Sequence, residues 1–283
     1  MCDYLFVSRQ RRALTIASSV RRLPESRTAA AWCSFAASKY RRQLTMLARS
    51  CNSGGGADLA VPHSETWIDV GSHRILLLES VADNKTTPNA IATRLWRCAL
   101  GTAAWLSEQA QIFDALVVLE VGSGTGLCAL ALAATSTARI IASDLDETAV
   151  ALVRAAAHRQ ALRLEAVITL DLSLTEATDP LPTAEWMVAC DVMYTPDVAT
   201  ALAQRCAEQL RRGGHVLVTD PDRKARAVFQ ARLDELLGTP TRFVRLQEAP
   251  SLLEVLNEAT REGRPALVLL LVDEHCRPPF FGR

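Results

Sequence analysis

The chain has 283 residues, 49% of them hydrophobic, and its 31 basic and 31 acidic residues give no formal net charge. No apolar run reaches the length of a membrane span and no block rich in Pro or Gly divides the second half, so we expect one large core and no membrane partner. Residues 1–50 carry ten Lys or Arg and only two acids, which leaves the remainder acidic. An acidic body argues against nucleic acid as a partner and favours a basic protein segment.

The N-terminal stretch is predicted to lie apart from a single domain. Residues 1–57 form a basic extension and residues 58–283 form the domain. The extension is rich in Ser and Ala and poor in acids, a composition typical of an organellar transit peptide. Its last residues, 51–57 (CNSGGGA), have the composition of a flexible linker. A merely disordered basic tail is the alternative.

The predicted domain opens with a hairpin. Strands are expected over 65–70 and 73–79, joined by a Gly-Ser pair. A helix should follow, capped near Thr87 with Pro88 in its first turn. Five residues recur at helical spacing and give this helix a buried stripe: Ile91, Leu95, Cys98, Thr102 and Trp105.

After this helix, strands and helices alternate, which indicates βαβ units and a parallel sheet. Strands are predicted over 115–121, 139–143, 166–170, 186–190 and 215–219. Helices are predicted from the glycine-rich turn through Ala134, over 147–159, around Val198, Leu202, Cys206 and Leu210, and over 223–237. The last two strands, 242–246 and 266–272, are expected to form an antiparallel edge. The fold predicted is therefore α/β, a Rossmann-like seven-stranded sheet that is mostly parallel with an antiparallel edge and is preceded by a β-hairpin.

The strongest motif is the glycine-rich turn in LEVGSGTG, residues 119–126. A buried strand opens onto Gly122, Gly124 and Gly126, and a helix follows. A turn without Cβ atoms lets the polar groups of a ligand lie against the backbone and the helix N-terminus. Leu127 stands where the dinucleotide motif G-x-G-x-x-G has its last glycine, which argues against a nicotinamide dehydrogenase. The G-x-G-x-G spacing is instead similar to that of methyltransferases.

Two acids follow the next strands. Asp144 ends the second strand of the sheet, about 20 residues after the glycines, where an acid commonly accepts the ribose hydroxyls of an adenosine ligand. The alternative is a helix cap, a role that Asp146 suits better. Asp171, after the third strand, is a candidate acceptor for an adenine amino group.

The fourth strand ends in Cys-Asp-Val-Met-Tyr, residues 190–194. Ligands of open α/β sheets bind outside the carboxyl ends of the strands, so Asp191 and Tyr194 can both face the crevice. Asp191 could orient an ammonium group, and Tyr194 could wall a narrow methyl path. The alternative is that Asp191 caps the next helix and Tyr194 packs on it. Residues 220–223 (DPDR) border the same crevice or form a plain Pro turn.

The eight cysteines show no C-x-x-C pair and no zinc spacing with the five histidines. We therefore expect no metal site. Several cysteines fall on predicted apolar faces and are expected to be reduced core thiols of an intracellular protein.

Several of these motifs together resemble a known family: the hairpin, Leu95-Trp96-x-x-Ala99, LEVGSGTG, Asp144 and DVMY (191–194). They resemble the seven-β-strand, class I S-adenosylmethionine-dependent protein lysine methyltransferases over residues 65–240. DVMYTPD and DPDR are most similar to mitochondrial members that act on the β subunit of electron-transfer flavoprotein. The resemblance favours the mitochondrion, with plastid and cytoplasm as alternatives.

The resemblance also implies roles for individual residues. Asp191 and Tyr194 would be catalytic, on the acceptor side. Contacts to S-adenosylmethionine would come from Trp96, Glu120, Gly122, Ser123, Gly124, Gly126, Asp144, Leu145, Asp171, Leu172 and Cys190. Two departures, Leu172 in place of a frequent aromatic residue and Arg97 after Trp96, leave the cofactor assignment standing but weaken the choice of substrate.

The sequence thus predicts an S-adenosylmethionine-dependent N-methyltransferase acting on a protein side chain, with lysine as the favoured acceptor. A small-molecule methyltransferase is one alternative. A catalytically silent assembly factor with the methyltransferase fold is another.

Overall fold

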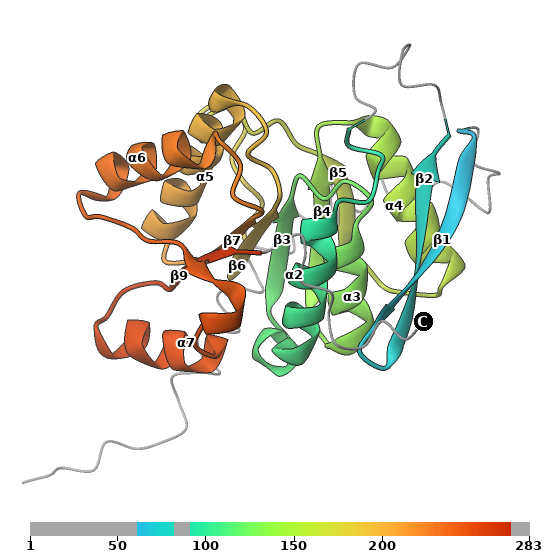
Figure 1. Ribbon diagram of the computed structural model, residues 1–283, viewed down its shortest axis with the longest axis horizontal. Helices are drawn as coiled ribbons and strands as arrows, with labels where there is room; N and C mark the ends of the chain where they lie inside the picture. Colours follow the sequence, from blue (N-terminus) through green and yellow to red (C-terminus); the bar gives the residue numbers. More distant parts are fainter. Residues whose placement is uncertain (1–60, 82–90, 273–283) are drawn as a thin grey trace, which may run out of the picture. The chain divides into compact units, whose positions relative to one another are not determined.

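The computed structural model describes residues 61–81 and 91–272 (Figure 1). The basic extension, its predicted boundary at residue 57, and Thr87 and Pro88 lie outside the described residues. Within the described part of the chain, no helix is long and apolar enough to cross a membrane.

The described residues form a two-stranded hairpin and a seven-stranded sheet with helices. The hairpin strands are β1 (His63–Val70) and β2 (His73–Ser80), and they pair antiparallel, as predicted. The sheet strands are β3 (Val117–Val121), β4 (Arg139–Asp144), β5 (Ala166–Thr169), β6 (Trp186–Cys190), β7 (His215–Asp220), β8 (Val244–Arg245) and β9 (Leu267–Leu271). The helices are α2 (Arg97–Glu108), α3 (Leu127–Thr135), α4 (Glu147–Arg159), α5 (Pro196–Arg211), α6 (Arg226–Leu237) and α7 (Leu252–Arg261), with short 3₁₀ turns η1 (Ala110–Phe113) and η2 (Leu246–Glu248).

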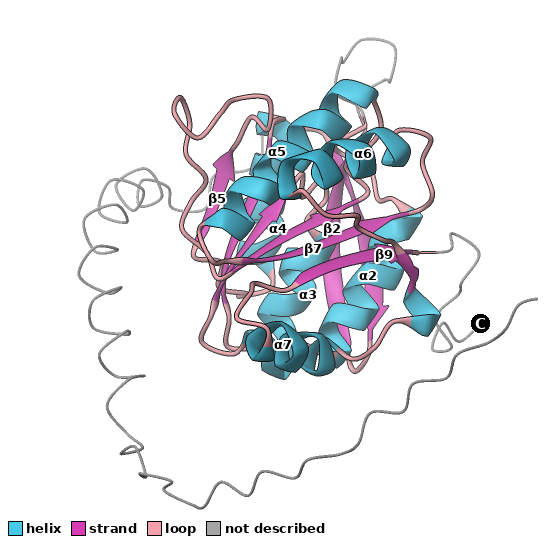
Figure 2. Cartoon of the chain, turned by 90° about the vertical axis from the view of Figure 1, so that its left-hand side faces the viewer, coloured by secondary structure: helices cyan, strands magenta, loops and turns pink. Residues whose placement is uncertain are grey.

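The strand order in the large sheet is β5-β4-β3-β6-β7-β9-β8. Within this sheet the chain first forms β3 and then adds β4 and β5 toward one edge. It next crosses to β6, on the opposite side of β3. Helices α5 and α6 pack together on one face, while α2 and α3 pack together on the other (Figure 2). This is the doubly wound α/β fold that the alternating pattern predicted, and its topological switch point lies between β3 and β6.

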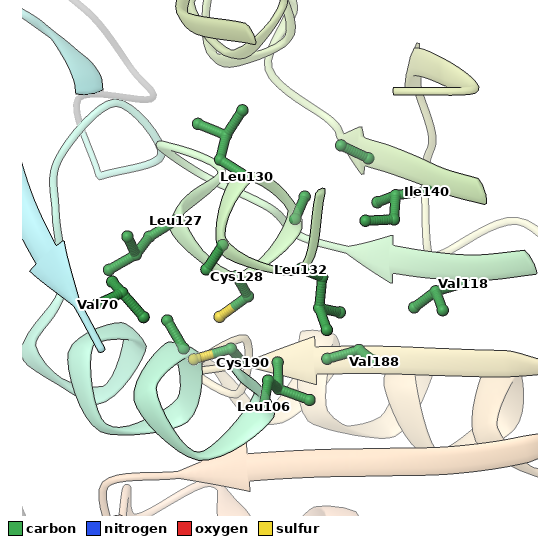
Figure 3. Close-up of a cluster of buried hydrophobic side chains, with 14 of the residues drawn as sticks. Val70, Leu106, Val118, Leu127, Cys128, Leu130, Leu132, Ile140, Val188 and Cys190 are labelled. Atoms are coloured by element: carbon green, nitrogen blue, oxygen red, sulfur yellow. The ribbon is translucent and has the colours of Figure 1, made fainter. Parts of the chain in front are cut away.

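Helix α3 lies between the sheet and the hairpin, because it contacts both β4 and β2 as well as α2. Six of its residues in succession are buried: Leu127, Cys128, Ala129, Leu130, Ala131 and Leu132. Figure 3 shows three core side chains from the sheet strands beside it, Val118, Ile140 and Val188. A helix covered on both sides has no face for polar residues, which explains its uniform apolar sequence.

The predicted antiparallel edge is wrong. Strand β9 pairs in parallel with both β7 and β8. The cause is α7, a helix that was not predicted and that connects β8 to β9. A helical crossover carries the chain back to the end from which β8 started, so the next strand runs parallel. The missed signal is a capping box, in which Ser251 and Glu254 satisfy each other's backbone amides at the start of α7.

The first predicted helix begins later than expected. Residues 91–94 form turns, and α2 begins only after Trp96, whose backbone is extended. Ile91 is exposed and does not belong to the buried stripe. The amide of Leu95 donates to Glu79 Oε1 at 2.9 Å, so this residue is tied to β2 instead of to a helix. Similarly, α6 begins at Arg226 and not at residue 223; the amide of Arg223 donates to Asp220 Oδ1, and residues 224–225 form a turn before the helix.

Candidate active site

A pocket of about 380 Å³ opens at the carboxyl ends of the central strands. Its lining comes from the turns after β3 (122–125), β4 (144–146), β5 (170–173) and β6 (190–192), together with residues 91–99 and the first turns of α5. Parallel α/β sheets bind ligands at this place, beside the point between β3 and β6 where the order of the strands reverses.

All but one of the residues predicted to contact the cofactor or the acceptor line this pocket. These are Trp96, Glu120, Gly122, Ser123, Gly124, Asp144, Leu145, Asp171, Leu172, Cys190, Asp191 and Tyr194. The exception is Gly126, which does not line it. A Cβ on Gly126 would lie 2.7 Å from Val153 Cγ2, so this glycine allows α4 to approach the start of α3. Residues 220–223, which could have bordered the same crevice, do not line it either.

The glycine-rich turn presents backbone without side chains at Gly122 and Gly124, where it borders the pocket. Gly122 and Gly124 have φ values of 64° and 55°, a region that favours glycine. A Cβ on Gly122 would lie 2.8 Å from Val192 Cγ2, and one on Gly124 would lie 3.2 Å from the carbonyl oxygen of Ala92. Both the backbone conformation and the available space therefore require glycine here.

The carboxylate of Asp144 accepts hydrogen bonds from this turn and from the residue that precedes α4. Its Oδ2 accepts from the amide of Gly124 at 2.8 Å, and its Oδ1 accepts from the amide of Asp146 at 3.0 Å. Burial raises the pKa of Asp144 above its usual value. A carboxylate has about four acceptor positions, so two remain for donors such as ribose hydroxyls. The helix cap is Asp146, as predicted, because its Oδ1 accepts from the amides of Thr148 and Ala149.

Glu120 lies at the pocket's floor. Its Oε2 accepts from the amide of Ala129 at 2.9 Å, which joins β3 to α3. Burial raises the pKa of Glu120 to about 8, so this carboxyl group is mostly protonated at neutral pH and can donate a hydrogen bond. Only the family resemblance, not the sequence pattern, marked this residue.

Asp191, which also lines the pocket, forms an ion pair with an arginine. Its carboxylate accepts from Nε of Arg223, and the guanidinium carbon of Arg223 lies 5.2 Å from the ring centre of Trp96. The amide of Arg223 donates to Asp220 Oδ1 at 2.7 Å. This fixes the backbone from which Arg223 reaches Asp191.

Asp191 is also conformationally strained. Its φ of 59° places a non-glycine residue in the left-handed region, at a cost of about 1–3 kcal/mol. Asp191 is not the cap of α5, because the amide of Val198 donates to Thr195 Oγ1. The capping alternative for Asp191 is therefore wrong. Strain without a structural role in capping is typical of functional positions.

Tyr194 lies at the rim of the pocket with half of its surface exposed. Partial burial, followed by the charge of Asp144, raises the pKa of its phenol. The hydroxyl therefore stays protonated at neutral pH. We call Gly122, Gly124 and Asp144 the glycine end of the pocket, and Trp96, Asp191 and Tyr194, with Arg223 bound to Asp191 outside the lining, the Asp191 end.

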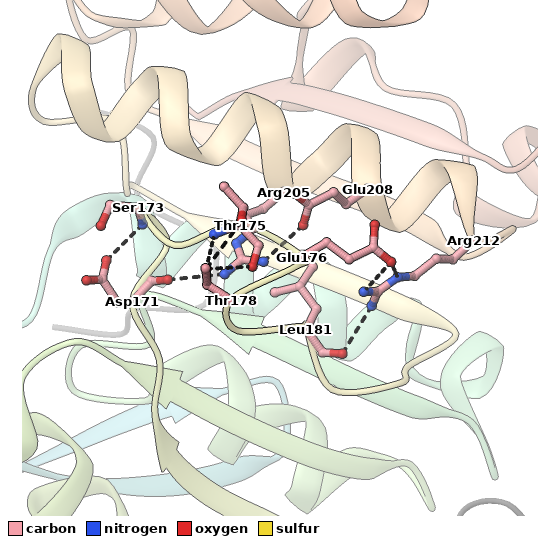
Figure 4. Close-up of polar contacts among 9 residues, drawn as sticks. All are labelled: Asp171, Ser173, Thr175, Glu176, Thr178, Leu181, Arg205, Glu208 and Arg212. Atoms are coloured by element: carbon pink, nitrogen blue, oxygen red, sulfur yellow. Dashed lines mark hydrogen bonds and ion pairs between the residues drawn. The ribbon is translucent and has the colours of Figure 1, made fainter.

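Sequence reasoning did not find the network that holds the loop after β5. Arg205 of α5 is fully buried, and it donates to Glu208 Oε2 at 3.0 Å and to the carbonyl oxygen of Asp171 at 3.3 Å (Figure 4). Arg212 binds Glu176 at 2.9 Å and the carbonyl oxygen of Leu181. The available signal was a pair of opposite charges, at positions 205 and 208, on a face of α5 that is otherwise apolar.

The parallel sheet, the glycine-rich turn and the acid that ends β4 together define the class I methyltransferase fold. A sequence model of the lysine methyltransferase family matches residues 79–235, which is more than half of the chain. The chain therefore belongs to the lysine methyltransferase family. The residues present fit S-adenosylmethionine as the cofactor of this family, since a Cβ would fill the cradle and carboxyl groups surround it.

Solved structures of other methyltransferases are similar to this chain. The 16S rRNA N2 G1207 methyltransferase of T. thermophilus, solved with AdoMet and guanosine, is 19% identical, with 66% of this chain and 48% of that chain covered and a TM-score of 0.48. A methyltransferase from Pyrococcus furiosus is 19% identical over 49% of this chain and 71% of that chain, with a TM-score of 0.40. One from Clostridium acetobutylicum is 15% identical over 43% and 48%, with a TM-score of 0.33. The chain spans about half the length of the first of these. Comparison with curated protein sequences gives no match.

Proposed function

We propose that this protein transfers a methyl group from S-adenosylmethionine to the side-chain nitrogen of a lysine in a protein. The observation that carries the proposal is the charge of the pocket. Among its described lining residues, Arg94 is the one base, whereas five are aspartates, besides the mostly protonated Glu120: Asp144, Asp146, Asp171, Asp191 and Asp197. A sulfonium cofactor and an amine acceptor both suit a pocket of this sign.

The chemistry needs alignment more than it needs a strong base. When bound, S-adenosylmethionine supplies a methyl group on a positively charged sulfur. The residues of the chain have to bring an uncharged amine into line with that methyl carbon and exclude water. Asp191 would orient the nitrogen through a hydrogen bond, and Tyr194 would wall the approach.

Arg223 would set how strongly Asp191 holds a charged amine. A carboxylate that is already paired with a guanidinium attracts an incoming ammonium less strongly than a bare one does. An ammonium has no lone pair and cannot accept a methyl group. The Arg223–Asp191 pair would therefore favour the neutral, reactive form of the acceptor.

The test is methylation of extracts from cells that lack this protein. The extract is incubated with radiolabelled S-adenosylmethionine and wild-type or Asp191→Ala protein, and labelled bands are analysed by mass spectrometry. We expect methylated lysine in a protein band with the wild type, and no label with Asp191→Ala although it still binds S-adenosylhomocysteine. Label confined to small molecules would support a small-molecule methyltransferase. Cofactor binding without any label would support the silent assembly factor.

We further propose that residues 1–57 direct the protein to mitochondria and that its protein partner presents a basic segment. The composition of the extension and the excess of acids in the rest of the chain support these two points. Fusing residues 1–57 to a fluorescent protein tests the first, since a diffuse cytoplasmic signal would contradict it. Salt-sensitive binding of the labelled substrate tests the second.

A further inference from the structure

Three thiols meet beneath the pocket. Cys98 comes from α2, Cys128 from α3 and Cys190 from the end of β6, and all three are buried. The sulfur of Cys190 lies 3.9 Å from that of Cys98. Figure 3 shows the sulfur of Cys128 pointing toward that of Cys190. Cys128 and Cys190 also line the pocket, and Cys190, with 9% of its surface exposed, is the more accessible of the two.

The surroundings of Cys190 favour its thiolate form. Side-chain contacts with Cys128 and Cys98 lower the pKa of Cys190, burial opposes them, and Thr102 Oγ1, 3.4 Å from its sulfur, adds to the lowering. The thiolate is the form of cysteine that reacts with oxidants and electrophiles. No step in the proposed methyl transfer uses this reactivity.

We propose that Cys190 and Cys98 form an oxidation site in the floor of the cofactor pocket, at which hydrogen peroxide produces a disulfide between β6 and α2. This inference does not depend on which substrate is methylated. The pair has two properties that such a site needs: a second thiol within 4 Å, and a route from solvent through the pocket to Cys190.

The reaction proceeds in two balanced steps. The Cys190 thiolate attacks one peroxide oxygen, the O–O bond breaks, and a sulfenic acid forms with release of hydroxide, which takes up a proton as water. The Cys98 thiol then attacks the sulfenic sulfur, the S–O bond breaks, and a second water leaves. The two thiols together lose two electrons, and peroxide gains them.

Closing this bond would disturb cofactor binding. A disulfide requires a sulfur–sulfur distance of about 2.05 Å, so Cys190 and Cys98 must approach from the present 3.9 Å. Cys190 directly precedes Asp191, whose left-handed backbone leaves little freedom to follow. We expect the oxidised protein to bind S-adenosylhomocysteine about tenfold more weakly than the reduced protein.

The experiment treats full-length protein with hydrogen peroxide and maps disulfides by mass spectrometry without reduction. Cleavage after Lys and Arg leaves Cys98 and Cys128 in one peptide, so a second cleavage after Glu is needed to separate them. Cys206 is a matched internal control, because it is also buried and its pKa is raised by that burial. Full-length Cys128→Ser and Cys98→Ser variants identify the partner of Cys190.

The proposal expects a Cys98–Cys190 link in the wild type and in Cys128→Ser, reversal of the link by dithiothreitol, and slower formation when the pocket is saturated with S-adenosylhomocysteine. Cys98→Ser should form no such link, and its unchanged affinity for S-adenosylhomocysteine shows that it is folded. The proposal is overturned if Cys206 is oxidised as fast as Cys190, if Cys190 pairs only with Cys128, or if no disulfide forms.

Discussion

The glycine end of the pocket is built from backbone, whereas the Asp191 end is built from side chains. At the glycine end, left-handed glycines and amides that donate to Asp144 define the surface. At the Asp191 end, an ion pair between Arg223 and Asp191 and a guanidinium over Trp96 define it. A backbone surface is rigid and suits a ligand that never changes. A side-chain surface can be altered by a single substitution, so we expect the choice of acceptor to be set at the Asp191 end.

The largest effect is expected at the glycine end. Gly122→Val should abolish measurable binding of S-adenosylhomocysteine, a loss of at least about 100-fold or ~2.7 kcal/mol, because the new side chain meets Val192 and cannot adopt the backbone conformation. Calorimetry measures this affinity. Gly238→Ala is the control, since Gly238 also has a positive φ (68°) but has open space around it. Equal losses in both variants would mean that strain, and not the shape of the cradle, decides binding.

The next effect is a dependence of stability on pH that comes from Glu120. Its pKa of about 8 in the folded protein lies above the ordinary value of 4.5. The stability it contributes is therefore fully present below pH 4.5 and is lost as the pH rises through about 8. Between about pH 6 and 8 the wild type should lose on the order of 2 kcal/mol more than Glu120→Gln does. Urea unfolding at the two pH values measures this difference, and parallel curves for the two proteins would rule it out.

A smaller loss is expected for Asp144→Asn. The amide keeps the size of the carboxylate but places a donor opposite the amide of Gly124 or that of Asp146. Affinity for S-adenosylhomocysteine should fall about tenfold, or ~1.4 kcal/mol. The same calorimetric measurement applies, and Asp234→Asn, at a surface loop contact with Thr241, is the control. An unchanged affinity would remove Asp144 from the cofactor contacts.

The smallest effect on cofactor affinity is expected for substitutions at the Asp191 end. Arg223→Gln should change affinity for S-adenosylhomocysteine less than about twofold, yet lower kcat for the methylated protein several-fold, since Asp191 would hold the ammonium form. Arg223→Lys, which keeps the charge, should restore most of the rate. Arg232→Gln breaks a surface pair with Glu235 and serves as the control. A raised KM with unchanged kcat would instead make Arg223 a simple binding residue.

The same contrast explains what could be predicted from the sequence. The glycine end follows from local signals: a strand, alternate glycines and an acid at the end of the next strand. The contact among Trp96, Asp191 and Arg223 joins elements far apart in the chain, so no spacing of residues in the sequence predicts it. The start of α2 was misplaced for the same reason, because the contact between Leu95 and Glu79 is tertiary. The parallel edge was missed because α7 is short and only its capping residues mark it.

The hairpin lies mostly outside the region that defines the family. The family match begins at residue 79, near the end of β2. A shortened chain starting there would lose β1 and the buried residues Ile75, Leu76, Leu77 and Leu78. Helix α3 has no polar side to offer, so its outer surface would then face water and favour aggregation. Any working fragment of this protein therefore has to begin before His63.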